Sequence, residues 1–440
     1  MKLSIKGFKS IHEIKEFSFL PLTMLTGINS SGKTSLVQSL LLLKQTLESE
    51  TKEVLRLNGK YISTENGHDL VNGKSETDQF GFVIELGEND LRFLDGYGER
   101  GISHVKYSVV FHVNSGVYVR NIGVEVNHLG HNVGYTIERR ESKEAGQGYM
   151  ITPRHFKLRK GKEEISFKTP YAVFFSNFFP QFAISLDGKV DPVTLRLPLI
   201  DDVMSLVTSF FSSIYYVGPL RVKPEPVISY SSSSFKDVGI DGLYTRFLLH
   251  NQRDIKVNDQ ETLLEASRRW LCKELHLADS LETIKDGTNS YRVVLRNNGL
   301  EVDLCHMGLG VSQVLPIIVQ GLLVPEGGML IVDSPEVHMH PSVQAGLVDF
   351  FIELSRNGKK VLIETHSDHM ITRLRRRVAE GLDPANVNLC FVTCTKKGST
   401  YETLGIDKQG VFFGGMPKGF MDTQDIDFRK IVEAKFTQHE

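Results

Sequence analysis

The sequence predicts an α/β fold in which a parallel-sheet head is split in sequence and carries an inserted β-rich and helical region. Three observations predict it. Apolar runs typical of buried strands precede helical patterns near the start, at 22–47, and again at 329–380. Such strand–helix alternation is typical of a parallel sheet. Between these parts, the stretch 104–126 alternates polar and apolar residues, which indicates antiparallel strands.

These patterns divide the chain into four expected segments: 1–74 and 301–440 form the head, 75–200 is β-rich and 201–300 is mainly helical. Strands are expected at 2–8, 14–20, 22–26, 329–333 and 361–366, and helices at 33–47, 203–217, 263–277, 341–355 and 368–380. The charged, glycine-containing segment 138–148 indicates a loop.

Composition excludes several classes of protein. The 51 Lys and Arg residues nearly balance the 53 Asp and Glu residues, so nucleic acid would have to bind to a local patch. Four cysteines in 440 residues do not make a disulfide framework. No run approaches the roughly 18 apolar residues of a membrane span, and the start lacks a secretory pattern. We therefore expect a cytoplasmic protein with no membrane contact.

The most specific motif lies between the first buried strand and its helix. Residues 27–34 fit the phosphate-binding pattern G-x-x-x-x-G-K-[ST] in full, at an expected chance rate of roughly one per cent. Its glycines let backbone N–H groups point at phosphate oxygens, Lys33 would contact the β- and γ-phosphates, and the Thr34 hydroxyl would bind Mg²⁺. The nucleotide-binding residues that we predict from it are Gly27, Asn29, Ser30, Ser31, Gly32, Lys33, Thr34 and Ser35.

Polar residues follow two later strands. Asp333 ends the run MLIVD, where an acid would hold the Mg²⁺ shell together with Thr34. Glu336 is a candidate to orient or deprotonate a water. The simpler alternative is that an acid near a helix start is stabilised by the helix dipole. His366 ends VLIETH, and polar residues at the carboxyl ends of parallel strands face the ligand crevice. Alone, such a histidine is more often structural.

A glycine-rich segment, 308–313 (GLGVSQ), precedes the apolar run VLPIIVQGLL. Glycines with Ser and Gln at a helix start can present N–H and hydroxyl donors to an anion. An ordinary N-capped helix is the simpler interpretation of the segment by itself.

The order of these motifs resembles the ABC-type ATPases of the SMC-like and OLD-like kind. More narrowly, it resembles prokaryotic AAA-family ATPases with a short C-terminal segment of unknown function, of the kind found in anti-phage defence modules. The resemblance rests on GFKS (7–10), GINSSGKTS (27–35), PEVHMHP (335–341), ETHSDH (364–369), RLRRR (373–377) and GMPKGFMD (415–422), and in the middle on YVGPLR (216–221).

The resemblance implies an ABC-type P-loop ATPase head that binds ATP and Mg²⁺. Gly310, Ser312 and Gln313 would be the signature motif, which contacts the nucleotide of a second subunit, so two heads of a homodimer or higher homo-oligomer would close on ATP. His366 would be the switch histidine, and 338–340 would lie at the dimer seam. Arg221 would lie near the nucleotide or the subunit interface.

One departure concerns catalysis. Heads of this kind usually carry Glu directly after the strand acid, whereas this chain has Ser334 there and Glu336 two residues later. Asp333, Glu336 and His366 are therefore our candidate catalytic residues, for an ATPase that could be slow without its partner. No acidic cluster suited to a Toprim nuclease follows His366, so the resemblance implies a separate effector protein, a nuclease or a toxin.

Two other functions stay open from the sequence. The first is a DNA-repair or SMC-like DNA-processing ATPase, with Arg373 and Arg375–Arg377 as a nucleic-acid footprint, although a solvated helix face explains that run more simply. No long heptad stretch predicts a coiled coil. The second is an ATP-held scaffold with negligible turnover.

Overall fold

The computed structural model divides the chain into two compact units. The first contains Met1–Ser18, Thr34–Ile214 and Cys394–Thr400, and the second contains Phe19–Lys33, Tyr215–Thr393 and Tyr401–Glu440. The structure describes residues 1–51, 53–73, 77–94, 100–142, 146–154, 159–160, 163–164, 167, 169–185, 194–223, 225, 234–287, 290–414, 417, 420, 426–427, 429–431 and 434. Within these ranges, no helix has both the length and the hydrophobicity that a membrane crossing requires.

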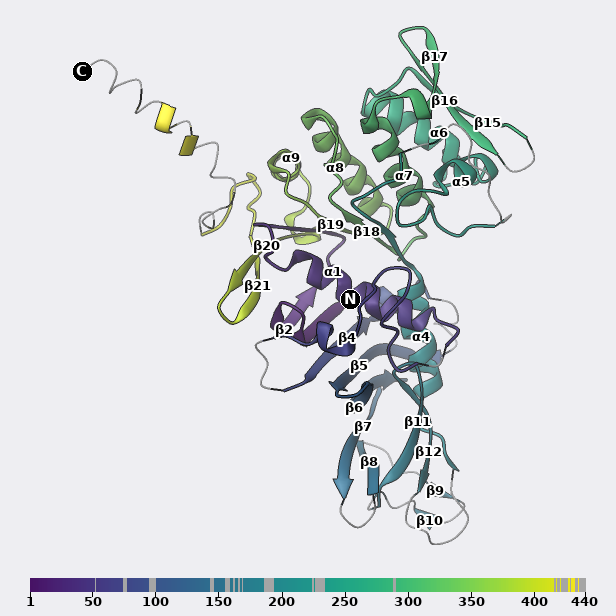
Figure 1. The fold of residues 1–440 in the computed structure, drawn as a ribbon, viewed down its shortest axis with the longest axis vertical. Helices are drawn as coiled ribbons and strands as arrows, with labels where there is room; N and C mark the ends of the chain where they lie inside the picture. The colour runs from purple at the N-terminus through teal and green to yellow at the C-terminus, as the bar shows by residue number, and fades with distance from the viewer. Residues whose placement is uncertain are drawn as a thin grey trace. The chain divides into compact units, whose positions relative to one another are not determined.

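The first unit is built on a ten-stranded sheet of order β13-β12-β11-β8-β7-β6-β5-β4-β1-β2, which Figure 1 shows from purple to teal. Its neighbours pair antiparallel. The strands are β1 (Lys2–Phe8), β2 (Ile11–Ser18), β4 (Gln79–Gly87), β5 (Ile102–Val113), β6 (Val117–His128), β7 (His131–Ser142), β8 (Gly146–Arg154), β11 (Tyr171–Ser176), β12 (Phe179–Ser185) and β13 (Thr194–Leu195). β9 (Arg159–Lys160) and β10 (Glu163–Glu164) form a separate pair.

One face of this sheet is buried because its strands alternate. In β5, every second residue from Val105 to Val113 is buried, as the period-two pattern predicted. Phe8, Phe80, Phe82 and Phe111 pack edge to face or tilted in the same core. The helices of this unit are α1 (Lys33–Leu47, its first residue belonging to the second unit), η1 (Gly67–Leu70), α2 (Glu88–Leu91) and α4 (Ile200–Ser212).

Most of a six-stranded sheet of order β14-β18-β19-β3-β20-β21 belongs to the second unit, while Ile214, the end of β20 and the start of β21 are assigned to the first. The strands of this sheet are β3 (Leu22–Gly27), β14 (Ile214–Val217), β18 (Met329–Asp333), β19 (Lys360–Glu364), β20 (Val387–Thr395) and β21 (Gly398–Thr403). β18, β19, β3 and β20 pair parallel. Every residue of β18 is buried, which explains why its sequence is an uninterrupted apolar run.

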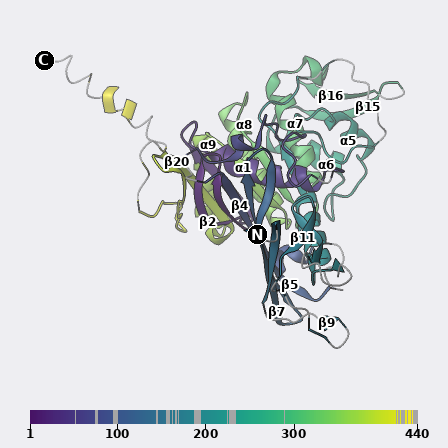
Figure 2. The ribbon, with the colours of Figure 1, turned by 60° about the horizontal axis from the view of Figure 1, so that its bottom comes forward.

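Helices complete the second unit. α7 (Leu309–Leu323) is buried along nearly its whole length, and α8 (Pro341–Arg356) packs against α9 (Asp368–Ala379), as Figures 1 and 2 show. The remaining helices are α5 (Thr245–Asn251), α6 (Leu263–Arg268), the π-helix η2 (Arg269–Glu274), η3 (Leu304–His306) and η4 (Pro384–Asn386). β15 (Ser280–Lys285), β16 (Tyr291–Asn297) and β17 (Leu300–Asp303) form a three-stranded antiparallel sheet.

The predicted α/β class is confirmed, with corrections to single elements. The segment 138–148 is not a loop over its described residues, because β7 runs to Ser142 and β8 begins at Gly146. The run 203–217 is not one helix: α4 ends at Ser212 and β14 follows. The region 201–300, expected to be mainly helical, also contains β14, β15 and β16. Most of the motif GMPKGFMD (415–422) lies outside the described residues.

Candidate functional site

Three parallel strands of the second unit bring their carboxyl ends to one edge. Across this edge Leu25 of β3 lies in register with Glu364 of β19, which lies in register with Asp333 of β18. The predicted phosphate-binding loop leaves β3 directly after this point. Because ligands of parallel sheets bind beyond the carboxyl ends of the strands, this edge is the candidate site.

Backbone geometry in the loop requires its glycines. Gly27 has φ 143°, and a Cβ atom there would lie 2.1 Å from the carbonyl oxygen of Val392 on the neighbouring strand β20. Gly32 has φ 105°, again in the region that favours glycine. Ser30 also has a positive φ, 58°. The loop therefore curls tightly, as an N–H cradle requires.

Lys33 folds back over this curl. Its Nζ donates to the carbonyl oxygens of Gly27 at 3.0 Å and Ile28 at 2.8 Å, and the residue is only 3% exposed. Burial lowers the pKa of Lys33, and the carboxylates of Glu364, Asp333 and Glu336 oppose that shift. The ammonium group thus lies near the buried acids Asp333 and Glu364 and the half-buried Glu336, where a polyanion would provide it with additional partners.

The other side chains of the loop differ in exposure. Asn29 and Ser30 are exposed. Ser31 is fully buried, and its hydroxyl has no hydrogen-bond partner. A buried hydroxyl without a partner is unfavourable, so this atom is a donor and acceptor available to a bound group. Tyr401 fixes the end of the loop, since its hydroxyl donates to the carbonyl of Gly32 at 2.6 Å.

Thr34 and Ser35 belong to the first unit. Thr34 is exposed at the start of α1. Ser35 is buried, and its hydroxyl lies 2.8 Å from that of Ser10.

Asp333 is buried at the end of β18. Its Oδ1 accepts from the hydroxyl of Ser334 at 2.7 Å, and the Tyr216 hydroxyl points at Oδ2 from 3.5 Å. Burial raises the pKa of Asp333, the nearby charge of Glu336 adds to that rise, and the Ser334 hydrogen bond opposes it. A cation at this carboxylate would be favoured, because it would stabilise the charged form that burial disfavours.

Glu336 lies against the end of β19. Its Oε2 accepts from the Thr365 hydroxyl at 2.8 Å, and its Oε1 accepts from the backbone N–H of His366 at 2.7 Å. The sequence placed His366 at the end of the strand, but β19 ends at Glu364 and His366 lies two residues beyond it, with an exposed side chain. Partial burial and the charge of Lys33 lower its pKa, which favours the neutral form of the ring.

Arg221 lies beneath the same turn. Its Nη2 donates to the carbonyl oxygens of Asp333 at 2.9 Å and Ser334 at 3.3 Å. The residue is 6% exposed, and burial lowers its pKa to about 10. The expected proximity of Arg221 to the site residues is therefore seen within the second unit.

The predicted signature residues lie at the start of α7. Gly310 is half-buried, whereas Ser312 and Gln313 are buried. The Ser312 hydroxyl donates to the Leu309 carbonyl at 2.9 Å, and Gln313 Nε2 donates to the Arg221 carbonyl at 3.1 Å. The Ser312 and Gln313 side chains thus point into their own unit, and a ligand at this helix start would meet backbone groups first.

The structure gathers Lys33, Asp333, Glu336 and His366 at one sheet edge. The sequence analysis missed Glu364, which is buried between the strand acid and the loop and is, of the three acids that raise the pKa of Lys33, the one with the largest effect. Its signal was an acid inside an otherwise apolar strand. Tyr216 and Tyr401 were also missed, because only the folded chain brings them to the site.

The residues present fit a nucleoside triphosphate with Mg²⁺. The orphaned Ser31 hydroxyl and the buried Lys33 ammonium are suited to phosphate oxygens, and Asp333 supplies a hard oxygen ligand. Among the described residues, no three His, Cys, Asp or Glu side chains gather closely enough to hold a metal ion by themselves. Mg²⁺ at Asp333 would therefore depend on phosphate and hydroxyl oxygens as well.

The arginine run on α9 is engaged within its own unit. Arg373 and Arg377 form ion pairs with Asp349, while Arg376 and Arg377 both pair with Glu380. The remaining member of the run, Arg375, donates to the carbonyl of Gly410 and lies over the ring of Phe412. These contacts favour a structural role over a nucleic-acid footprint.

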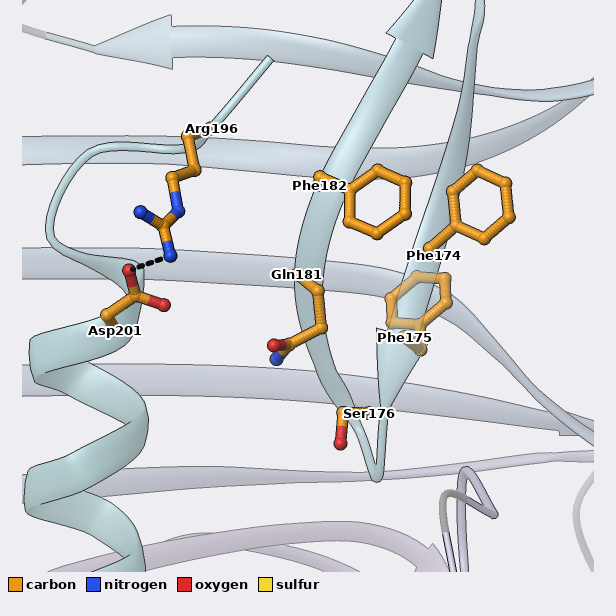
Figure 3. A pocket seen from close by; sticks show the side chains of 7 residues that line it. All are labelled: Phe174, Phe175, Ser176, Gln181, Phe182, Arg196 and Asp201. Carbon is orange, nitrogen blue, oxygen red and sulfur yellow. Dashed lines mark ion pairs between the residues drawn. The ribbon is translucent and has the colours of Figure 1, made fainter. Parts of the chain in front are cut away.

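A separate cavity of about 560 Å³ lies in the first unit and contains none of the predicted site residues. Figure 3 shows its phenylalanines on β11 and β12 and, on the other side, the ion pair of Arg196 and Asp201 at 3.5 Å. The rings of Phe174 and Phe182 stack at 4.6 Å. Its lining is Phe174, Phe175, Ser176, Gln181, Phe182, Arg196 and Asp201.

Comparison with known proteins agrees with this geometry. Residues 173–371 match the family described as an AAA domain, putative AbiEii toxin, Type IV TA system. A comparison with curated proteins gives no match.

Among solved structures, the SMC head bound to the C-winged-helix domain of ScpA is 12% identical, with 92% of this chain and 98% of that chain covered and a TM-score of 0.50. The SMC head from Thermotoga maritima is 12% identical, with 92% and 98% covered and a TM-score of 0.39. An SMC head with an extended coiled coil, bound to the C-terminal domain of ScpA derived from Pyrococcus furiosus, is 11% identical, with 92% and 96% covered and a TM-score of 0.47.

The first of these similarities confirms the predicted ABC-type head fold. Together with the family match, it supports an ABC-type P-loop ATPase.

Proposed function

We propose that this protein binds ATP with Mg²⁺ at the 27–34 loop and hydrolyses it to ADP and phosphate. One observation carries the proposal: the loop lysine and the carboxylates of Asp333, Glu336 and Glu364 converge at the carboxyl edge of one parallel sheet. Phosphoryl transfer needs little more from a protein than a phosphate cradle, charge neutralisation and a positioned water.

Each residue then has a separate task. Lys33 leaves its two loop carbonyls and binds the β- and γ-phosphates, while the Ser31 hydroxyl gains the partner it lacks. The nucleotide supplies the phosphoryl group. Mg²⁺ would be held by Asp333 and, as the motif predicts, by the Thr34 hydroxyl, and it would neutralise charge on the phosphates. Glu336, held by Thr365 and by the N–H of His366, orients the attacking water and accepts its proton.

The exposed His366 side chain is suited to contact the γ-phosphate. Ser334 lacks a carboxylate, so turnover is expected to be modest unless a partner accelerates it.

We further propose that ATP closes a dimer of heads, that hydrolysis reopens it, and that this cycle gates a separate effector in bacterial anti-phage defence. In the closed dimer, the helix start at Gly310–Gln313 of one copy would face the nucleotide of the other. The description of the matched family as a putative toxin of a toxin–antitoxin system supports a place in such a module. The solved SMC head, which has the same fold, is bound to part of a second protein, ScpA.

The decisive experiment compares ATP turnover by the wild type, Lys33→Ala and Glu336→Gln, with molecular size measured with and without ATP. Glu282→Gln is the control, because it removes an exposed carboxylate from β15 in the same unit. We expect Lys33→Ala to lose ATP binding. Glu336→Gln should bind ATP, accumulate as an ATP-bound oligomer and turn over at least about 100-fold more slowly, since general bases contribute about that much.

The outcomes separate the proposals. If the wild type binds ATP tightly without turnover and Glu336→Gln behaves identically, the isolated chain is a nucleotide-held scaffold. If turnover requires Glu336 but size never changes with ATP, hydrolysis stands and the closing dimer fails.

A DNA-processing role is the second candidate, because the head fold is shared with an SMC head. Two observations weigh against it. The α9 arginines are already paired, and α8, with 16 residues, is the longest helix in the described ranges, which is short for an SMC-type coiled coil. Salt-dependent binding of duplex DNA by the wild type would favour it.

A further inference from the structure

Arg221 is a buried arginine whose charge and hydrogen-bond donors are only partly compensated. Its guanidinium is buried, yet among the described residues it forms no direct ion pair and donates to two carbonyl oxygens. Its Nε and Nη1 are buried without hydrogen-bond partners. A buried cation with unused donors is costly, and such features usually reflect function rather than stability.

The first contact of this residue is with the acidic turn that follows β18. The guanidinium binds the carbonyls of Asp333 and Ser334, and Ser334 has a left-handed φ of 47°. This conformation is strained for a residue with a side chain, so an external contact is needed to hold it. Because Glu336 follows two residues later, the orientation of the turn determines where that carboxylate lies.

The second contact is with α7. Gln313 Nε2 donates to the backbone carbonyl of Arg221 at 3.1 Å. Gln313 lies one turn beyond the exposed helix start at 308–309. The same residue therefore receives a bond from α7 and gives bonds to the acidic turn.

We propose that Arg221 is a positioning residue that couples the start of α7 to the acidic turn at 333–336. A ligand that binds at the start of α7 would displace Gln313 and, through its hydrogen bond, Arg221. Because Arg221 binds the carbonyls of Asp333 and Ser334, the turn that carries Glu336 would move as well. The expected change in ATP turnover rests on the proposed ATPase function. The coupling between α7 and the acidic turn does not depend on that function.

The test uses Arg221→Lys and Gln313→Met. Arg221→Lys replaces Nη2, which bonds both carbonyls, by an ammonium on a side chain that is one bond shorter. Gln313→Met removes the amide that donates to the Arg221 carbonyl. Arg246→Lys is the matched control: Arg246 is 3% exposed, donates to the Glu225 carbonyl at 2.8 Å and leaves Nη2 unpartnered, but it has no contact with the acidic turn. Hydrogen exchange of the 334–339 amides is measured together with ATP binding and turnover.

We expect both test variants to speed exchange at 334–339 and to lower turnover at saturating ATP by roughly tenfold, with ATP affinity changed less than about threefold. Arg246→Lys should leave exchange in this segment and turnover unchanged. In the double variant, the effects should not add, because both changes break one chain of contacts.

The inference is overturned if Gln313→Met leaves exchange at 334–339 as in the wild type, or if Arg246→Lys accelerates it equally. If Arg221→Lys does not fold, Gln313→Met decides alone. If the wild type shows no turnover, the proposed function fails, whereas the exchange measurement still decides the coupling.

Discussion

Replacing Gly27 by alanine tests the phosphate cradle at its tightest point. The added Cβ would lie 2.1 Å from the Val392 carbonyl oxygen, a distance that real Cβ atoms do not adopt, and 3.0 Å from the carbonyl carbon. The φ of 143° is also unfavourable for alanine. Strained backbone of this kind costs about 1–3 kcal/mol, and the clash must in addition displace the loop from β20.

The matched control is Gly381→Ala. Gly381 has φ 111°, but an added Cβ would meet nothing within 4 Å. Both variants should therefore lose stability through backbone strain. Only Gly27→Ala should also lose ATP binding, because only there must the loop move.

Thermal unfolding with and without Mg²⁺ and ATP measures both effects. At about 100 times the dissociation constant, ATP should stabilise the wild type by about 2.7 kcal/mol, and the Gly381 variant should keep that gain. Gly27→Ala should show almost none. If Gly27→Ala retains the full stabilisation by ATP, the argument that this close approach shapes the phosphate cradle is refuted.

Three further outcomes follow from the structure. Thr365→Val should lower turnover by roughly tenfold while Thr365→Ser preserves it, because only valine removes the donor to Glu336; steady-state kinetics with equal ATP affinity would check this. Burial lowers the pKa of Lys359 to about 8, below its value in the unfolded chain, so the unfolded state binds more protons above pH 8. The stability of the wild type relative to Lys359→Met should therefore rise between pH 8 and 10, by up to roughly 3 kcal/mol, in denaturant titrations; a pH-independent difference would contradict this. Phe178→Ala should destabilise the first unit by about 3–5 kcal/mol and Phe174→Ala by only about 1 kcal/mol, since the first ring is fully buried and the second is 46% exposed; equal shifts of the unfolding midpoint would count against this assignment of the core.

The sequence identified the parts of the head whose local pattern is unambiguous. β18 and α1 have the predicted bounds, because a buried parallel strand is a short apolar run and α1 has a broad apolar face at helical spacing. The run 203–217 was ambiguous for the same physical reason: an apolar run fits both a buried helix and a buried strand, and here it is α4 followed by β14. The charged segment 138–148 was misjudged because exposed strand positions tolerate charge.

The candidate site was predictable where a motif carries its own geometry. The phosphate-binding loop is such a motif, and so is an acid at the end of an apolar strand. Glu364, Tyr216 and Tyr401 could not be assigned in the same way. Their positions depend on strand register and on which distant segments become neighbours. A local sequence pattern determines neither of these.

The turn at Ser334 also limits which residues can replace Ser334 without loss of a contact at the site. Ser334 already adopts its left-handed conformation at the cost that a residue with a Cβ incurs, so the specific loss on replacing it by glutamate is the hydrogen bond from its hydroxyl to Asp333. A single substitution that moves the proposed base to the position directly after Asp333 therefore removes a hydrogen bond from that buried carboxylate. Lineages that keep this hydrogen bond keep a hydroxyl at that position, and they depend on Glu336 for the carboxylate.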